Sequence, residues 1–404
     1  MNVIFVEPAF PNNQRQFVRG LAEVGAKVIG IGERPEDWLD DELRGWMAHY
    51  HQIANVTEVA ALKAAVQWVQ SKLWVDRLEA TVEAHILPTA QVREACRIPG
   101  TSIRTAWLCR DKPSMKEALR TAGVPTAESI GADTPDQVRA FAGRVGYPLI
   151  LKPRAGAGAA GTFRVDSDTE LSGALEHYQR ASIAVEEFVE GHEGFYDTLS
   201  IDGRPVHDFV SHYFPNVLEA MRSRWISPQF VSTNRVDSVS DYDQLKEMGR
   251  RVNEVLGIGT SATHMEWFFG PKGLRFSEIG CRPAGVGAWD LYAVGNEMDI
   301  YREWANAIVH GRADQRATRA FAAGMVALRP DADGMILGYS GLDEVEDRYR
   351  EWIIDRHVPS PGTATQPVEA GYMANAYLRM KHPDFDRLRD MLTDVGERVS
   401  VHAG

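Results

Sequence analysis

Several features that mark particular protein classes are scarce or missing in this sequence. It has 404 residues but only three cysteines, Cys96, Cys109 and Cys281, and none of them forms a Cys-x-x-Cys pair. An odd number of widely spaced cysteines argues against a disulfide framework. No run of about 18 apolar residues occurs, so a membrane span is not expected. The opening residues MNVIFVEP are apolar only briefly and predict a first strand rather than a signal peptide, so we expect a cytoplasmic protein.

Excess positive charge and two familiar nucleotide-binding motifs are also absent. The net charge is −12, which argues against nucleic acid as a partner. No Gly-x-Gly-x-x-Gly pattern follows the first predicted strand, so a dinucleotide site there is not supported. The glycine-rich stretch after Lys152 is not a P-loop, because the lysine precedes the glycines. A small anionic ligand remains compatible with this charge, since backbone amides and a few basic side chains suffice to bind it.

The apolar pattern predicts a mixed α/β chain with more than one domain. With 44% apolar and 25% charged residues, the composition is ordinary for a globular protein of two or three domains. Residues 2–7 and 27–32 indicate parallel strands around a helix at 13–25, which predicts an α/β domain. Asp202-Gly203 between two apolar runs predicts a β-hairpin. The other predicted elements are helices at 113–122, 134–146, 241–256, 298–310 and 384–396, and strands at 149–152 and 182–189.

The most informative pattern is a later hairpin that carries two glutamates. The runs 264–269 and 274–279 flank Lys272, so a hairpin centred on this lysine places Glu266 opposite Glu278. Directly opposed residues have Cβ atoms about 5 Å apart, and two carboxylates that close repel unless a cation lies between them. Because Mg²⁺ is bound by carboxylates together with phosphates and water, this hairpin predicts a Mg²⁺–nucleotide site.

The hairpin register has a second consequence and an alternative interpretation. It places Phe268 opposite Phe276, and it places Gly280 opposite His264. The alternative is that the two glutamates lie on a solvated face, as glutamates on hairpins often do. Apolar residues on both faces of the two strands weaken that alternative.

Two further segments have the composition of ligand-binding loops. Lys152 precedes a loop at 155–161 that is rich in glycine and alanine, and glycine lets backbone N–H groups approach and cradle phosphates. The alternative for this loop is a surface turn. The apolar strand at 184–189 ends in acidic residues before Gly191, where a carboxylate and strand-end backbone groups could bind an adenine edge. The alternative for this segment is an ordinary strand end.

Taken together, these segments resemble the ATP-grasp superfamily over roughly residues 100–312. The segments that carry the resemblance are, in order, Asp111-Lys112 with Ala122–Pro125, then Gly146–Pro153, then Glu186–Glu193, then Ala262–Phe268 with Glu278–Pro283. The resemblance implies an ATP-grasp fold, α/β and α+β, in four parts. These are an N-terminal Rossmann-like domain at 1–110, a small lid subdomain at 111–190, a large catalytic lobe at 191–317 and a C-terminal β-rich accessory region at 318–404.

The resemblance also implies roles for individual residues. Lys112 and Lys152 would contact the phosphates of ATP, and Glu266 and Glu278 would ligate Mg²⁺, with Mn²⁺ as a substitute. Arg282 would stabilise an acyl-phosphate and its tetrahedral adduct, and with Lys152 it forms the expected catalytic pair. The remaining expected ATP contacts are Gly156, Gly158 and Gly161 over the phosphates, Glu186, Glu187 and Val189 at the adenine, and Glu193 at the ribose. The phosphate loop is expected to be mobile without nucleotide.

One position departs from the pattern of the superfamily. Two residues after the second metal-binding glutamate the family often has asparagine as a further ligand, whereas this chain has Gly280. Some amino-acid ligases of the superfamily also have glycine there, so the departure does not imply inactivity. His264 faces this position in the expected register and is a candidate metal ligand or a residue behind the ligands. The alternative is a packed strand histidine bonded to the backbone.

The expected reaction follows from the branch that the chain resembles most. Residues 281–287 are similar to a stretch of amino-acid ligases, and residues 318–401 to the accessory piece of those ligases and of biotin carboxylase. The branch implies an ADP-forming ligase that activates a small carboxylate as an acyl-phosphate and couples it to an amine, with Arg222 or Arg224 binding a substrate carboxylate. Solvent-exposed loop arginines are the alternative. A homodimer is expected from the resemblance.

Two other functions stay open. A biotin-carboxylase-like or purine-biosynthesis-type enzyme shares the same ATP chemistry, although the basic run expected at a bicarbonate site is not matched. A non-catalytic ATP-binding module is the alternative of another class. It is disfavoured because Lys112, Lys152, Glu266, Glu278 and Arg282 are all present.

Overall fold

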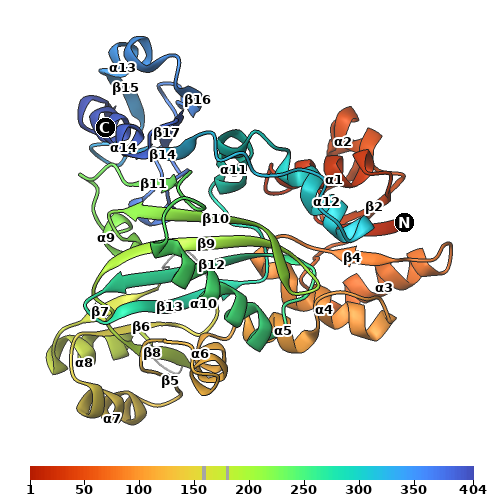
Figure 1. The fold of residues 1–404 in the computed structure, drawn as a ribbon, viewed down its shortest axis with the longest axis horizontal. Coiled ribbons are helices and arrows are strands. Elements are labelled where there is room, and N and C mark those ends of the chain that lie inside the picture. Colours follow the sequence, from red (N-terminus) through yellow and green to blue (C-terminus); the bar gives the residue numbers. More distant parts are fainter. Residues whose placement is uncertain (157–160, 179–181) are drawn as a thin grey trace.

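The N-terminal part of the chain is a parallel α/β unit. The computed structural model describes residues 1–156, 161–178 and 182–404 (Figure 1). Its first sheet has the strand order β3-β2-β1-β4, and all of its pairs are parallel, as the apolar first strand predicts. The elements of this part are β1 (Asn2–Val6), α1 (Gln14–Glu23), β2 (Lys27–Gly32), α2 (Asp41–Trp46), β3 (His49–Gln52), α3 (Val59–Gln70), β4 (Arg77–Glu79), α4 (Glu83–Cys96) and α5 (Ile103–Leu108).

A small antiparallel sheet with its own apolar core follows, and it lies at the bottom of Figure 1. Its strand order is β5-β8-β6-β7. Helix α7 begins at a capping box formed by Thr134 and Gln137, with Pro135 in the first turn. The elements of this part are α6 (Lys112–Thr121), β5 (Ser129–Ala132), α7 (Pro135–Val145), β6 (Leu149–Pro153), β7 (Phe163–Val165), α8 (Asp168–His177) and β8 (Ile183–Glu187).

The rest of the chain is organised around an eight-stranded sheet of order β13-β12-β9-β10-β11-β14-β17-β16. The hairpin predicted at Asp202-Gly203 joins β9 (His192–Ile201) to β10 (Arg204–Phe214), which confirms that prediction. The other strands are β11 (Gln229–Ser232), β12 (Ser261–Gly270), β13 (Gly273–Gly280), β14 (Ala322–Leu328), β16 (Ile353–His357) and β17 (Ala376–His382). Since β14, β17 and β16 extend the sheet of the β12–β13 hairpin, one sheet crosses the boundary predicted near residue 318.

Helices and one further strand pair complete this part. Helix α10 (Asp241–Leu256) has the bounds that the sequence predicts. The remaining helices are α9 (Val217–Ala220), α11 (Ala288–Asn296), α12 (Ile300–His310), α13 (Leu342–Tyr349) and α14 (Phe385–Arg398). Strand β15 (Ile336–Ser340) pairs with β18 (Ser400–Ala403). Within the residues that the structure describes, no helix combines the length and apolar character needed to cross a membrane.

The β12–β13 hairpin confirms one part of its predicted register and corrects another. Glu266 pairs with Glu278 and His264 with Gly280, as predicted. The expected Phe268–Phe276 pair is wrong, because the register shifts after Glu266 and Phe276 pairs with Trp267. A β-bulge of this kind leaves one residue unpaired and re-aims the backbone beside it. The N–H of Phe276 donates to the carbonyl of Pro125 at 2.8 Å, so the bulge links the hairpin to the small-sheet part.

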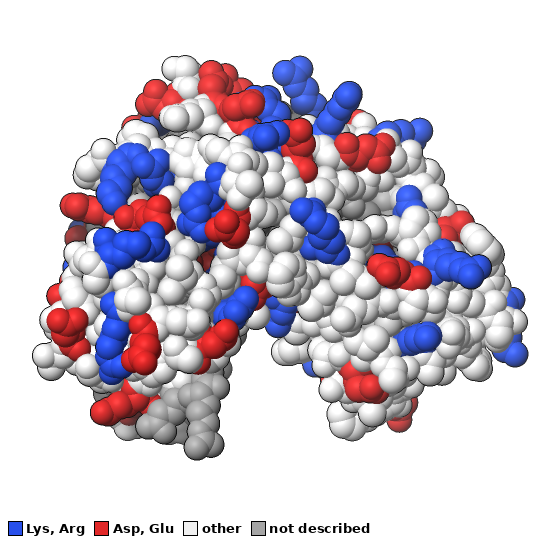
Figure 2. Space-filling view, turned by 90° about the horizontal axis from the view of Figure 1, so that it is seen from below, with Lys and Arg blue, Asp and Glu red and all other residues white. Residues whose placement is uncertain are grey.

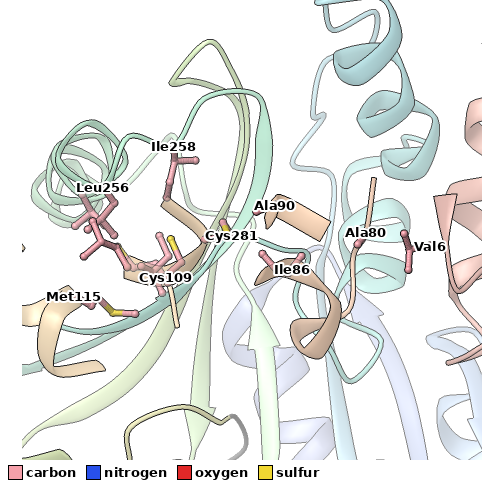
Figure 3. Packing of buried hydrophobic residues seen from close by; sticks show 14 of the residues in the cluster. Val6, Ala80, Ile86, Ala90, Cys109, Met115, Leu256, Ile258 and Cys281 are labelled. Carbon is pink, nitrogen blue, oxygen red and sulfur yellow. The ribbon is translucent and has the colours of Figure 1, made fainter. Parts of the chain in front are cut away.

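A continuous apolar core connects the N-terminal unit to this hairpin. One cluster of buried side chains includes Val6 of β1, Ala80 directly after β4, Ile86 of α4 and Cys281 directly after β13 (Figure 3). Figure 3 shows Cys281 beside Ile86 and Ala90 of α4. The N-terminal helix α4 is therefore seated against the end of the strand that carries Glu278.

Candidate active site

A cavity of about 850 Å³ brings most of the predicted site residues together. It is lined by residues of the small sheet, the large sheet and the C-terminal region. Its charged wall residues include Lys112, Lys116, Lys152, Glu186, Glu193, His264, Glu266, Glu278 and Arg282. On the face seen in Figure 2, basic and acidic side chains are interspersed and the surface is deeply hollowed.

Helix α6 and strand β6 place three ammonium groups at one end of the cavity. Lys112 and Lys116 are four residues apart on α6 and therefore share a helix face. Asp111 caps α6 by accepting from the N–H of Ser114 at 3.2 Å, and its carboxylate binds Arg154 at the end of β6. The start of α6 is thereby fixed beside Lys152.

These lysines share two carboxylates. Glu186 Oε2 lies 2.6 Å from the Nζ of Lys116 and 3.0 Å from that of Lys152. Glu278 Oε2 lies 3.4 Å from the Nζ of Lys112 and 3.6 Å from that of Lys152. Three ammonium groups gathered on one wall form a site for a polyanion. No sequence motif identified Lys116, although its spacing from Lys112 places both lysines on one face of α6.

The pKa values of the lysines and of Glu186 follow from their burial and from the sharing of each carboxylate between two lysines. Burial opposes the charge of Glu186, but Lys116 and Lys152 outweigh it and lower the pKa of the carboxyl to about 2. Burial lowers the pKa of Lys116 to about 8, because Glu186 is shared with Lys152 and only partly compensates the desolvation. Burial also opposes the charge of Lys152, yet Glu186 and Glu278 raise the pKa of this lysine. Lys116 is therefore the ammonium most easily discharged.

The predicted adenine and ribose segment lies on the same cavity. Glu187, Phe188 and Val189 line it together with apolar side chains of the two sheets. The carboxylate of Glu187 pairs with Lys272 at 2.7 Å. Glu193 is buried, and its carboxylate accepts from the N–H of Val217 at 2.7 Å. Burial, with Glu266 adding to it, raises the pKa of Glu193 to about 8.

Glu266 and Glu278 form the candidate metal site. Both line the cavity from adjacent positions of the hairpin. Burial opposes the charge of Glu278, but Lys112 and Lys152 lower the pKa of its carboxyl. Among the described residues, no group of three or more His, Cys, Asp or Glu side chains is arranged to hold a metal ion. A pair of carboxylates without a further side-chain ligand fits Mg²⁺, which completes its shell with phosphate oxygens and water.

His264 stands at the end of a buried hydrogen-bonded chain. Its Nδ1 lies 2.7 Å from Oδ1 of Asp197, and the hydroxyl of Tyr292 donates to Oδ2 of Asp197 at 2.7 Å. Its Nε2 lies 3.8 Å from Oε1 of Glu266. Burial disfavours the charged imidazole, but Asp197 raises the pKa of His264 to about 9. The partner of His264 is thus a carboxylate rather than the backbone, and no sequence motif predicted Asp197 as that partner.

Arg282 lies on the cavity wall, where two of its nitrogens are held. Its Nε donates to Oε2 of Glu83 at 3.0 Å, and its Nη1 donates to the carbonyl of Pro283 at 2.8 Å. Glu83 is the first residue of α4, so the N-terminal unit contributes to the site. No sequence motif could have identified this partner, because Glu83 and Arg282 are 199 residues apart.

Of the two arginines predicted to bind substrate, Arg222 lies at the cavity and Arg224 does not, and only some of the predicted loop glycines are described. Arg222 lines the cavity and donates to the carbonyl of Thr162 at 2.7 Å. Arg224 bonds the carbonyl of Pro330 and pairs with Asp333, and it is not among the cavity-lining residues described. The carbonyl of Gly156 accepts from Lys112 at 2.9 Å, and Gly161 has a φ of 65°. Gly158 and the middle of the predicted phosphate loop lie outside the described residues.

This geometry agrees with the comparison against protein families. Residues 117–296 match the ATP-grasp domain. The chain carries an ATP-grasp domain. The solved structures that it resembles span nearly its whole length and agree in fold. The L-amino acid ligase from Bacillus licheniformis superposes with a TM-score of 0.78 at 17% identity, covering 100% of this chain and 98% of that one. N5-carboxyaminoimidazole ribonucleotide synthetase from Thermotoga maritima superposes with a TM-score of 0.73 at 16% identity, covering 100% of this chain and 99% of that one.

The curated proteins that this chain is similar to include L-amino acid ligases and phosphoribosylglycinamide formyltransferases. The L-arginine-specific L-amino acid ligase of Bacillus subtilis is 26% identical over 258 residues, which are 60% of each chain. The formate-dependent phosphoribosylglycinamide formyltransferase of Mycolicibacterium gilvum is 24% identical over 353 residues, covering 83% of this chain and 85% of that one. The chain spans three fifths of the arginine-specific ligase and half of the alanine–anticapsin ligase of Bacillus subtilis.

Proposed function

We propose that this protein is an ATP-dependent, ADP-forming ligase that activates a small carboxylate as an acyl-phosphate and joins it to an amine. The observation that carries the proposal is the convergence of three kinds of group on one cavity. These are the three lysines, the Glu266–Glu278 pair and the guanidinium of Arg282. Such a set suits phosphoryl transfer from ATP to an oxygen nucleophile, which depends mainly on positioning and charge stabilisation.

In this proposal the lysines exchange partners when nucleotide binds. Without nucleotide, Lys112 and Lys152 pair with Glu278, and Lys116 and Lys152 pair with Glu186. The phosphates of ATP would take up the N–H groups of these lysines and release Glu278. Glu266 and Glu278 would hold Mg²⁺, which neutralises phosphate charge when bound.

The substrates are held at the other end of the cavity. Arg282 donates its remaining N–H groups toward the activated carboxylate, since a guanidinium fork suits an acyl-phosphate and its tetrahedral adduct. The amine then attacks the acyl carbon and displaces phosphate. Neither step needs a serine or cysteine nucleophile.

The composition of the substrate end favours an amine over a phosphoribosyl substrate. The C-terminal segment contributes Glu369, Gly371 and Tyr372 to the wall, and helix α9 and the turn after it contribute Glu219 and Arg222. A phosphate monoester is a dianion and needs clustered cations for binding. The C-terminal segment offers a carboxylate and a tyrosine instead. A purine-biosynthesis-type reaction is the second candidate, supported by the formyltransferase relative that aligns with 83% of the chain.

A pooled-substrate assay tests the proposal. The purified chain is incubated with Mg·ATP and pools of amino acids and small carboxylic acids, and released ADP and phosphate are measured with mass spectrometry of the products. We expect ADP release that requires two pool members and a product equal to their summed mass less water. Release that depends on formate or bicarbonate with a phosphoribosyl amine would support the second candidate instead. ATP binding without release in either pool would contradict both reactions.

A further inference from the structure

Gly280 leaves room for a contact between the N-terminal unit and the catalytic hairpin. A Cβ atom at this position would lie 3.1 Å from Oε2 of Glu83, 3.4 Å from Cγ of Arg282 and 3.5 Å from Nε of Arg282. A separation of 3.1 Å is tighter than most Cβ contacts, so a side chain here would push the Glu83 carboxylate away. Because Gly280 has no side chain, the carboxylate of Glu83 has the space to pair with Arg282.

Glu83 is itself firmly placed. It begins the 14-residue helix α4, and Arg110 donates to its carbonyl at 3.2 Å and to its Oε1 at 3.3 Å. The next turns of α4 carry Ile86 and Ala90, which pack beside Cys281 (Figure 3). The carboxylate that binds Arg282 therefore belongs to a helix that packs against Cys281, the residue directly before Arg282.

We propose that Glu83 is a positioning residue for Arg282, and that Gly280 is required so that Glu83 can reach it. The proposal rests on the function proposed above. Glu83 holds the Nε side of the guanidinium, and the carbonyl of Pro283 holds one N–H of Nη1, so the Nη2 edge stays available to the substrate carboxylate.

The arrangement also has a protective effect. Glu266 and Glu278 line the same cavity as Arg282. An unrestrained guanidinium among carboxylates would pair with one of them, because charge-assisted bidentate pairs are the stronger hydrogen bonds. Such a pair would compete with the metal ion for the same oxygens. Glu83 therefore orients Arg282 and keeps it away from the metal carboxylates.

The test compares Glu83→Gln and Gly280→Ala with the wild-type chain and with the control Gly259→Ala. Gly280→Ala keeps every charged group and adds one methyl beside Glu83. A Cβ at Gly259 meets nothing within 4 Å, so this control adds the same methyl elsewhere. For the ligase reaction we expect kcat to fall on the order of 10- to 100-fold in both variants, as for a misplaced catalytic group, with the KM for ATP unchanged. The double variant Glu83→Gln/Gly280→Ala should be no slower than the slower single variant.

Three results would overturn the proposal. They are full activity of Gly280→Ala, multiplicative losses in the double variant, or an increase in the KM for ATP that accounts for the whole effect. Binding of MgADP by each variant shows that the nucleotide site is folded. If the pools give no turnover, the proposed function fails, and the pair is tested alone by thermal unfolding of Glu83→Gln, Arg282→Met and their combination. Tm losses that add fully would then overturn the pairing, since interacting residues give non-additive losses.

Discussion

At the scale of single residues, the arrangement of Glu186 between two lysines sets the charge of the nucleotide end. One buried carboxylate cannot fully compensate two buried ammonium groups, so the less supported lysine has the lower pKa. Lys152 is also close to Glu278, whereas Lys116 contacts Glu186 alone among these acids. Among the three lysines, Lys116 is therefore the one whose charge should change near physiological pH.

ATP affinity should depend on the protonation of Lys116. With a pKa of about 8, this lysine is charged below pH 8 and loses its proton as the pH rises above that value. Bound phosphates favour the charged form, so binding takes up a proton above pH 8. The affinity should then fall by up to about tenfold per pH unit. Titration of MgATP binding between pH 7 and pH 9.5 measures this slope.

Lys116→Arg is the matched variant for that titration, because a guanidinium keeps its charge throughout this range. We expect its affinity for ATP to be nearly independent of pH. An equal decline in the wild type and in Lys116→Arg would show that another group is responsible. Lys116→Met should bind ATP more weakly at pH 7 and show no such decline.

The site residues that the sequence predicted and those that it did not differ in how far along the chain their contacting partners lie. Glu266 and Glu278 could be predicted because one hairpin brings them together, and the hairpin is visible in local apolar runs and a turn. Glu83 and Asp197 could not, because their partners Arg282 and His264 are 199 and 67 residues away. Asp197 reaches His264 through the pairing of β9 with β12, and Glu83 reaches Arg282 through the packing of α4 against the end of β13, and no local pattern encodes either contact.

At the scale of elements, the same limit applies to the details of regular structure. The sequence predicted the β12–β13 hairpin but not its bulge, and the wrong Phe268–Phe276 pair follows from assuming a regular ladder. The bulge is stabilised by a hydrogen bond from Phe276 to Pro125, a residue in another part of the chain. Helix α6 shows the opposite case, since Asp111 and Pro113 mark its start in the sequence.

Asp111→Ala should uncouple the start of α6 from the nucleotide site. The carboxylate caps the helix at Ser114 and binds Arg154, so its loss should lower the free energy of unfolding by about 1–2 kcal/mol. Because Lys112 is the first residue of α6, ATP affinity should fall as well. Chemical denaturation and nucleotide titration measure the two effects.

Thr134→Ala is the control for that variant. Thr134 caps α7 in the same small-sheet part, by accepting from the N–H of Gln137, and it does not line the cavity. Its loss should cost a similar free energy of unfolding and leave ATP affinity unchanged. If Asp111→Ala also left ATP affinity unchanged, the cap would serve the helix alone.

At the scale of the whole molecule, the C-terminal region contributes strands to the eight-stranded sheet that carries the candidate metal site. Strand β14 pairs with β11 along four residue pairs, and β17 pairs with β14 along seven. The region also supplies Glu369, Gly371 and Tyr372 to the cavity wall. A chain ending at residue 317 would leave β11 as an unpaired edge and expose the apolar side chains that β14 covers.

We therefore expect a fragment of residues 1–317 not to fold independently, although it contains the whole segment that matches the ATP-grasp domain. The buried cluster around Val231, Val326 and Leu378 would lose most of its members, since every buried residue of this cluster except Val231 follows residue 317. The fragment should aggregate or unfold without a cooperative transition, and MgADP should give it no thermal stabilisation. A cooperative thermal unfolding transition, with an affinity for MgADP equal to that of the full chain, would contradict this expectation. The C-terminal strands would then be needed only to complete the cavity wall and not for folding.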